Sequence, residues 1–365
     1  MGGAKRRRRL AQLLAGKEFE QPRRIADVSW KTYKNIAVGI SRLDDGTRVT
    51  LRRLKVEHSQ IVHTILAKLG NERLITELTT KLSQSEMTTL LLALSQEMTA
   101  QSSPVDLLSK YATNRFVKPS ELSPIKLKKI ELDMLELAEN SGFTSLELSP
   151  ASPLGSCSVI AKVDQNKVIS ATRGVELMSD STNMLAIYLA NGIKNKSINN
   201  SINDVHVCAA SRVTRGQWYK QANVLPHFGL FTLVSSGKDT GSYRFEKDTL
   251  TRHIAFYLNY YGGKLGQETK VFLHMRKGYT DSEGFLDRMV DHLNVEFPSY
   301  LFIEDRVESS NQYYKGLNFE VNVNGVNIVD GGFVDWTQQL LGNKKERLLI
   351  SGTGMDLQLI TGMIQ

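Results

Sequence analysis

Short runs rich in apolar, β-branched and aromatic residues recur along the second half of the chain, with helix-like segments between some of them. The strand candidates are VHVCAAS (205–211), HFGLFTLVSS (227–236), KVFLHM (270–275), YLFIED (300–305), GLNFEVNV (316–323) and RLLISG (347–352). Runs of this length and composition predict β-strands. Beyond residue 143 short strands alternate with helices, and we predict an α+β fold around an antiparallel sheet flanked by helices.

The first third of the chain has a different pattern. Residues 35–56 predict a hairpin that turns at Asp44-Asp45-Gly46. Apolar residues then recur at spacings of three and four over 61–69, 74–82 and 87–98, which predicts helices, and Ser103-Pro104 begins another. A further helix over 125–141 ends before Gly142.

A length of 365 residues favours two folded units. The proline-containing stretch FVKPSELSP (116–124) is the best linker candidate. We therefore predict a basic arm over 1–24, a mixed domain of hairpin and helices over 25–120, and a larger domain over 121–365.

The composition is that of an ordinary soluble protein, with 41% hydrophobic and 23% charged residues. No apolar run approaches the roughly 18 residues of a membrane span. Cys157 and Cys208 have no CxxC spacing, and the seven histidines are scattered. We expect reduced thiols, no metal centre and a cytoplasmic location.

The positive charge is concentrated at the N-terminus. Residues 1–56 contain 15 lysines and arginines against 5 acidic residues, a net charge of +10, whereas the whole chain carries +8. Such a segment is typical of RNA or DNA binding or, equally, of a solvated tail, and a membrane surface is a weaker alternative. The candidate nucleic-acid contacts are Lys5, Arg6, Arg7, Arg8, Arg9, Arg23, Arg24, Arg48, Arg52, Arg53 and Lys55.

Generic phosphate-binding motifs are incomplete. The stretch SSGKDTGS (235–242) lacks the first glycine and the final Ser/Thr of a P-loop. The terminal Gly352-Thr353-Gly354 has no third glycine, so a tight turn from strand to helix explains it better.

A set of motifs in order is more specific. GVELMSDSTNMLA, SRVTRGQ, HFGLFTLVSSG, QYYKGLNFEV, DGGFVDW and LLISGTGMDL follow one another between residues 174 and 357. Their order and spacing resemble the catalytic core of histidyl-tRNA synthetase, a class II aminoacyl-tRNA synthetase, over about residues 143–365. The resemblance implies a class II antiparallel sheet and a dimer formed through about 143–195.

The resemblance also implies a ligand pocket. In that family an acid at the position of Asp180 holds the amino-acid ammonium, and an arginine at the position of Arg212 clamps the ATP α-phosphate. Asp180 could equally be a helix N-cap, and Arg212 a surface charge. The pocket residues implied are Asp180, Thr182, Arg212, Arg215, Gln217, Leu230, Val234, Tyr313, Tyr314, Gly331, Gly332, Gly352 and Gly354.

Departures from the family matter as much as the matches. Leu230 and Val234 replace the residues that read the imidazole of histidine, so histidine is an unlikely substrate. Phe333 and Leu357 stand where the family has arginines, and a third family arginine is missing from the stretch 309–312. The chain ends at Gln365, where the family continues into an anticodon-binding domain, so we do not expect charging of histidine tRNA.

Two functions from different classes remain. The first is a catalytically silent synthetase paralogue that binds, dimerises or regulates, with RNA, DNA or another protein subunit as partner and no membrane. The histidyl-like regulatory subunit of ATP phosphoribosyltransferase shows that this fold can serve a regulatory role, which is an analogy at the level of the fold. The second is an adenylate-forming enzyme that activates an apolar amino acid or related carboxylate with ATP and Mg²⁺. No cofactor is certain, and a purely structural subunit is a further possibility.

Overall fold

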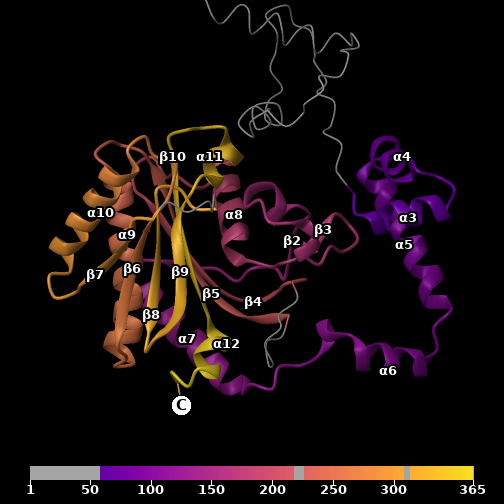
Figure 1. Cartoon of the computed structure of the whole chain (residues 1–365), viewed down its shortest axis with the longest axis horizontal. Helices are drawn as coiled ribbons and strands as arrows, with labels where there is room; N and C mark the ends of the chain where they lie inside the picture. Colours follow the sequence, from indigo (N-terminus) through magenta and orange to yellow (C-terminus); the bar gives the residue numbers. More distant parts are fainter. Residues whose placement is uncertain (1–57, 218–225, 308–312, 365) are drawn as a thin grey trace, which may run out of the picture. The chain divides into compact units, whose positions relative to one another are not determined.

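The computed structural model describes residues 58–217, 226–307 and 313–364 (Figure 1). The chain divides into two compact units, 1–81 and 82–365. The domain boundary expected at residue 120 stays a prediction, and the basic arm and the hairpin expected over 35–56 lie outside the described residues. None of the helices in the described ranges combines the length and apolar character that a bilayer span requires.

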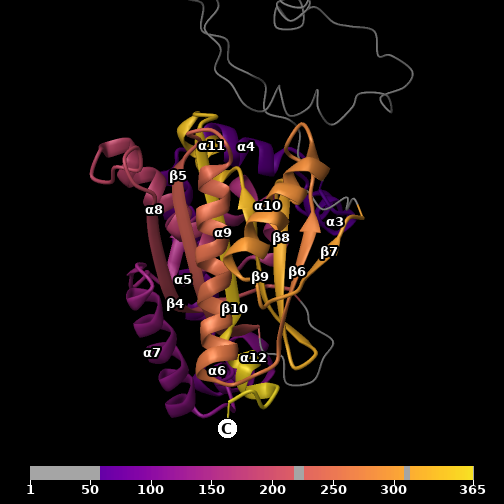
Figure 2. The same cartoon turned by 90° about the vertical axis from the view of Figure 1, so that its left-hand side faces the viewer.

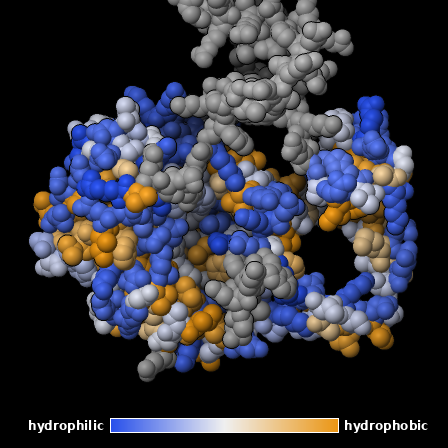
Figure 3. Space-filling model, viewed as in Figure 1, coloured by the Kyte–Doolittle hydropathy of each residue, from blue (hydrophilic) through white to orange (hydrophobic). Residues whose placement is uncertain are grey.

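The helices expected from apolar spacing are confirmed. Helices α3 (Gln60–Lys68) and α4 (Leu74–Lys81) belong to the first unit, and α5 (Gln84–Ala100) and α6 (Pro104–Thr113) to the second. Ser83 and Ser103 each begin a helix with a capping box, and Pro104 occupies the first helical position. Apolar patches interrupt the hydrophilic surface of these helices (Figure 3), because α5 and α6 bury no residue.

The centre of the second unit is an eight-stranded sheet in the order β1-β4-β5-β10-β9-β8-β6-β7. Most pairs in the sheet are antiparallel, as the sequence predicted, whereas the β1–β4 and β6–β7 pairs are parallel. The strands of this sheet are β1 (Thr144–Ser145), β4 (Val205–Thr214), β5 (His227–Lys238), β6 (Thr269–Met275), β7 (Phe302–Asp305), β8 (Leu317–Val323), β9 (Val326–Val334) and β10 (Glu346–Gly354). A separate pair consists of β2 (Ala151–Pro153) and β3 (Val175–Leu177).

Helices cover both faces of this sheet. The remaining elements are η2 (Arg115–Val117), α7 (Pro124–Asn140), η3 (Ser156–Ile160), η4 (Gln165–Lys167), α8 (Ser181–Asn195), α9 (Arg244–Tyr257), η5 (Leu258–Lys264), α10 (Ser282–Glu296), α11 (Trp336–Leu341) and α12 (Met355–Ile360). The larger apolar core joins one face of the sheet to α7, α9 and α10, and Figure 2 looks onto α9 and α10. The smaller core joins the opposite face to α8 and η3.

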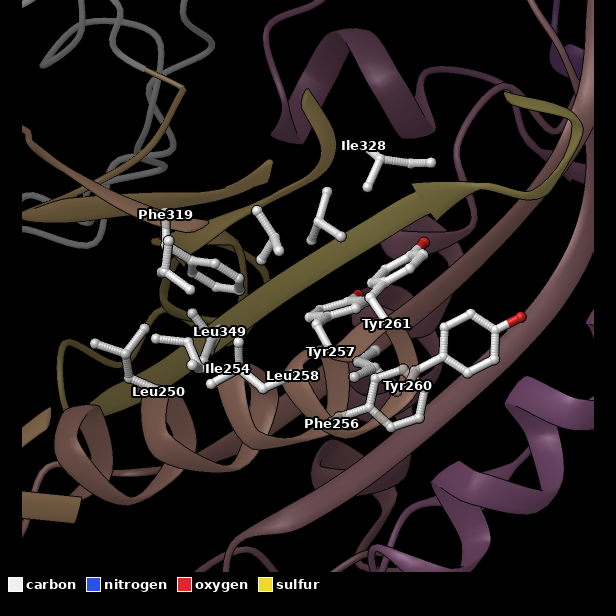
Figure 4. Packing of buried hydrophobic residues seen from close by; sticks show 14 of the residues in the cluster. Leu250, Ile254, Phe256, Tyr257, Leu258, Tyr260, Tyr261, Phe319, Ile328 and Leu349 are labelled. Atoms are coloured by element: carbon white, nitrogen blue, oxygen red, sulfur yellow. The ribbon is translucent and has the colours of Figure 1, made fainter. Parts of the chain in front are cut away.

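Aromatic side chains fill the larger core. Phe256, Tyr257, Tyr260 and Tyr261 project from the end of α9 and from η5 towards the strands (Figure 4). Phe256 stacks on Phe231 of β5 with ring centroids 5.4 Å apart. Replacing so large a buried ring by alanine leaves a cavity that lowers folding stability by about 3–5 kcal/mol. This aromatic layer therefore holds the sheet in place on the side opposite to α8.

A chain of buried hydrogen bonds crosses the same core. Ser235 Oγ lies 2.8 Å from His206 Nδ1 and 2.9 Å from His253 Nε2. Ser351 Oγ lies 2.8 Å from His253 Nδ1 and 3.0 Å from the Tyr257 hydroxyl. Burial lowers the pKa of His206 to about 4 and the pKa of His253 well below its usual value, so both imidazoles are neutral in the folded protein at neutral pH. The cysteines are also buried and carry no disulfide.

Candidate functional site

A cavity of about 500 Å³ opens on the α8 side of the sheet. Strands β5, β9 and β10 form its floor, and the start of α8 and the segments after β4 and before β8 form its walls. The lining residues are Cys157, Val163, Lys167, Ser179, Asp180, Thr182, Asn183, Arg215, Gln217, Leu230, Thr232, Tyr313, Tyr314, Asp330, Ile350, Ser351 and Gly352. Its size suits a small metabolite.

The first wall is built at the start of α8. Asp180 is the N-cap, and its Oδ1 accepts hydrogen bonds from the backbone N–H of Thr182 at 2.9 Å and from the Thr182 hydroxyl at 2.7 Å. Its other oxygen, Oδ2, lies 3.7 Å from Nη2 of Arg215. Asp180 therefore serves as a cap with one oxygen and presents the other to the cavity beside a guanidinium.

Arg215 is held in place by its own contacts. Its Nε donates to the carbonyl oxygen of Ser179 at 3.2 Å, and its guanidinium lies 5.0 Å from the centre of the Phe228 ring. The backbone after it is fastened by Arg115, whose guanidinium donates to the carbonyl oxygens of Gly216 at 2.6 Å and Gln217 at 3.1 Å. A cation is thus fixed at the wall before any ligand arrives.

The floor carries a second carboxylate. The Tyr314 hydroxyl donates to Asp330 Oδ2 at 2.7 Å. The pKa of Asp330 is raised to about 6, chiefly by loss of hydration; the Tyr314 hydrogen bond opposes this rise and the Glu320 carboxylate adds to it. Burial also raises the pKa of Tyr313 and of Tyr314 well above the usual phenol value, and both Asp180 and Asp330 add to it.

The back of the cavity is a neutral polar cluster. Cys157 Sγ lies 2.8 Å from Ser179 Oγ and accepts a hydrogen bond from Asn183 Nδ2 at 2.9 Å. Burial raises the pKa of the Cys157 thiol to about 11, so it is not a ready nucleophile at neutral pH. Asn183 is 1% exposed, and its Oδ1 accepts no hydrogen bond from the residues described here. A buried acceptor of this kind invites a donor from a ligand.

Several pocket residues expected from the sequence lie together on this cavity. They are Asp180, Thr182, Arg215, Gln217, Leu230, Tyr313, Tyr314 and Gly352. Their roles towards a ligand remain a proposal.

Arg212, expected to clamp a nucleotide phosphate, does not line the cavity. It lies opposite Gly229 in the β4–β5 register, and its side chain faces α12. Its Nη2 lies 3.3 Å from Asp356 Oδ2, and its Nε donates to His227 Nδ1 at 2.8 Å. Asp356 also accepts from the backbone N–H of Gly229 at 2.7 Å. The side chain therefore closes a structural contact between the sheet and α12.

The other expected pocket residues also lie outside the cavity. Val234 is fully buried in the apolar core beneath α8. A Cβ at Gly331 would lie 2.5 Å from Ser351 Cβ, and one at Gly332 would lie 2.6 Å from Tyr314 Cδ1, so both glycines serve close packing. Gly354 ends β10 and begins α12.

The cavity also contains residues that the sequence did not assign to the pocket. They are Cys157, Val163, Lys167, Ser179, Asn183, Thr232, Asp330, Ile350 and Ser351. Thr232 could have been predicted from Leu230, because residues two apart on a strand lie on the same face. Asp330 could have been predicted as a carboxylate next to two glycines in a matching motif. Cys157 and Lys167 come from short irregular turns that carry no periodic signal.

Other predicted functions cannot be placed on the structure. All of the candidate nucleic-acid contacts from Lys5 to Lys55 lie outside the described residues. Within the described ranges no group of three or more His, Cys, Asp or Glu side chains is arranged to hold a metal ion.

The sheet and the cavity on one of its faces define the class of fold. This is the fold of the class II aminoacyl-tRNA synthetase catalytic core, as the sequence motifs predicted.

Solved structures share this fold. One is an ATP phosphoribosyltransferase regulatory subunit/histidyl-tRNA synthetase from Bacillus halodurans, with a TM-score of 0.53 and 15% identity over 68% of this chain and 84% of that one. Another is apo histidyl-tRNA synthetase from S. aureus, with a TM-score of 0.50 and 12% identity over 66% of this chain and 67% of that one. No model of a known family matches the sequence, and no curated protein does.

Proposed function

We propose that this protein is a cytoplasmic histidyl-tRNA synthetase-like paralogue that binds a small amine-bearing molecule in its cavity without activating it, and that acts as a binding or regulatory module. The observation that carries the proposal is the pairing of Asp180 with Arg215 on the cavity wall, at 3.7 Å. A ligand with an ammonium and an anionic group can satisfy both side chains.

The distribution of acceptors supports an ammonium. Asp180 Oδ2, Asp330 and the unpartnered Oδ1 of Asn183 all belong to cavity-lining residues. An ammonium group has three donors and no acceptor, so it can bond several of these oxygens at once. Hydrogen bonds between a charged donor and a carboxylate are stronger than neutral ones.

The lack of cations that would stabilise ATP during activation supports catalytic silence. Leu357 stands where the resembled enzymes have the arginine that meets the γ-phosphate, and Phe333 is 3% exposed in the opposite core. Arg212 is engaged with Asp356. Loss of one donor that stabilises transition-state charge typically costs about 10²–10³ in rate, and these losses accumulate.

A second candidate is an adenylate-forming enzyme that uses ATP and Mg²⁺. The observation in its favour is that Arg215 and Lys167 both line the cavity, next to the aliphatic Leu230. Two cations could hold a phosphate chain there, with the apolar amino acid against Leu230.

Pyrophosphate exchange with ATP, measured for each of the common amino acids, distinguishes the two candidates. We expect no exchange above background for any amino acid, together with saturable calorimetric binding of at least one amine-bearing ligand. Robust exchange that Arg215→Ala abolishes and Arg212→Ala does not would establish the enzyme instead.

We also propose that the basic segment before residue 56 contacts RNA or DNA, and that the core forms a homodimer or joins another protein subunit. The segment's net charge of +10 supports the first idea, because each neutralised phosphate releases counterions. Deleting residues 1–24 is expected to weaken nucleic-acid binding and flatten its salt dependence. Unchanged binding would leave the arm as a solubility tail, and light scattering of the purified protein tests the dimer.

A further inference from the structure

Two carboxylates face each other beside the cavity floor. Glu320 of β8 lies directly opposite Asp330 of β9 in the sheet register, on the face that the cavity occupies. Like charges in directly opposed positions of a sheet are destabilising. Over the part of the chain that the structure describes, neither carboxylate forms an ion pair with a lysine or an arginine.

A buried amide adjoins this pair. Asn318 is 2% exposed, and its Nδ2 lies 3.5 Å from Asp330 Oδ1. Its Oδ1 has no hydrogen-bond partner within the described segments. A Cβ at Gly332, two residues from Asp330 on the same strand, would lie 2.8 Å from Asn318 Cβ, so the amide is on the same face as Asp330. Buried amide oxygens rarely stay unpaired in native proteins.

An imidazole completes the set. His274 of β6 pairs with Asn318 in the register. Its Nδ1 lies 2.9 Å from Asp305 Oδ2. Its Nε2 lies 3.6 Å from Glu320 Oε2 and has no hydrogen-bond partner among the described residues.

Carboxylate and amide oxygens gather at this place. Glu320, Asp330 and Asn318 Oδ1 are acceptors, Asn327 Nδ2 donates to Glu320 Oε2 at 2.7 Å, and the nearby cation is Arg276. The positive charge of Arg276 reaches Asp305 and Asp330 and lowers the pKa of both carboxyls slightly. One of its Nη1 hydrogens goes to the Met275 carbonyl oxygen, at 3.2 Å. Within the described residues Arg276 forms no ion pair with Glu320 or Asp330, and its Nε has no hydrogen-bond partner.

We propose that this cluster is a second ammonium subsite, so that the ligand of the cavity carries two cationic groups, as a basic amino acid or a short diamine does. The inference rests on the proposed function, because the first ammonium is placed at Asp180. The second lies over β8 and β9, where it bonds the carboxylates of Asp330 and Glu320 and the amide oxygen of Asn318. Tyr313 and Tyr314 line the same cavity as Asp180 and Asp330, and the Tyr314 hydroxyl donates to Asp330.

Matched ligand pairs test the subsite on the full chain. Calorimetric titrations compare lysine with norleucine, ornithine with norvaline, and 1,5-diaminopentane with pentylamine. Each pair has the same carbon skeleton and differs in one amino group. We expect the doubly cationic member to bind about tenfold or more tightly, the range for one added hydrogen bond to a charged group.

Variants separate this subsite from the rest of the cavity. Asp330→Asn and Glu320→Gln are each expected to remove the preference within every pair. Glu320→Gln, at a residue that does not line the first ammonium site, is also expected to leave binding of the monoamines unchanged. Glu268→Gln is the control, because Glu268 is an exposed carboxylate paired with Lys270 at another end of the sheet. Thermal unfolding of each variant confirms that it is folded, and the two test variants serve as independent checks.

The outcomes are distinguishable. Equal binding within each pair would overturn the second subsite and leave the proposed function intact, with water satisfying the buried acceptors. A preference that survives in both Asp330→Asn and Glu320→Gln would overturn it too. Failure of every amine to bind the wild-type protein would overturn the proposed function itself.

Discussion

The guanidinium of Arg212 lies 3.3 Å from the carboxylate of Asp356, whereas three residues along the chain Arg215 lies 3.7 Å from Asp180 in the cavity. The two arginines therefore have different tasks. The first joins the sheet to α12, and the second offers a fixed positive charge to a ligand.

Replacing Arg212 by alanine is expected to reduce stability and leave ligand binding unchanged. The side chain of Asp356 is 8% exposed and would lose its charged partner, but that of Arg212 is 41% exposed, so solvent screens the pair. We expect a loss of about 1 kcal/mol, measured by urea unfolding. A large loss of ligand affinity with normal stability would show that Arg212 reaches the cavity.

Asp330→Asn is expected to stabilise the protein at neutral pH. The folded pKa of Asp330 is raised to about 6 from an ordinary value near 3.8, so the folded state holds its proton more tightly than the unfolded state does. This contribution to stability is present below pH 4 and is lost as pH rises through 6. Thermal unfolding should show the variant more stable than wild type at pH 7.5, with no difference at pH 4. A wild type more stable at pH 7.5 would contradict the assignment.

Acid is expected to unfold the core through His206 and His253. The pKa of His206 is lowered to about 4, whereas an unfolded imidazole titrates near 6.5, so the unfolded state takes up protons first as pH falls. Stability therefore falls from pH 6.5 towards 4. His206→Gln cannot titrate and should lower the slope of unfolding free energy by up to about 1.4 kcal/mol per pH unit. An unchanged slope in urea unfolding between pH 4.5 and 6.5 would refute this.

Gly332→Ala is expected to destabilise the protein by about 1–3 kcal/mol. The added Cβ would lie 2.6 Å from Tyr314 Cδ1 and 2.8 Å from the carbonyl oxygen of Leu317. Gly354→Ala is the matched control, since its Cβ would meet Leu357 Cβ at an ordinary 3.4 Å. Thermal unfolding compares the two variants, and equal stability would exclude close packing as the reason for Gly332.

The sequence predicted most of the sheet because its strands carry apolar residues that only burial explains. Strand β9 was missed as a strand, since Asp330-Gly331-Gly332 is typical of a turn. Glycine is needed at both positions because a Cβ would clash with side chains of neighbouring residues. This cannot be predicted without knowing how β8 and β10 pack against β9. The order of the motifs supplied the family resemblance, and the resemblance predicted the fold.

The site could be predicted only in part. Motif order placed Asp180, Arg215 and Tyr314 near one another, but it could not say which face each strand residue takes. Arg212 and Val234 were assigned to the pocket for that reason. Asp330 was not assigned to the pocket, and its position there follows from its register with Glu320 and its contact with Tyr314.

The most direct test is a calorimetric titration of the full chain with a panel of amino acids and short amines, on wild type and Arg215→Ala side by side. Saturable binding to wild type is expected for at least one amine-bearing ligand with an acidic group, weakened about tenfold or more in Arg215→Ala and retained in Arg212→Ala. Binding of equal strength to wild type and Arg215→Ala, or none to wild type, would contradict the account.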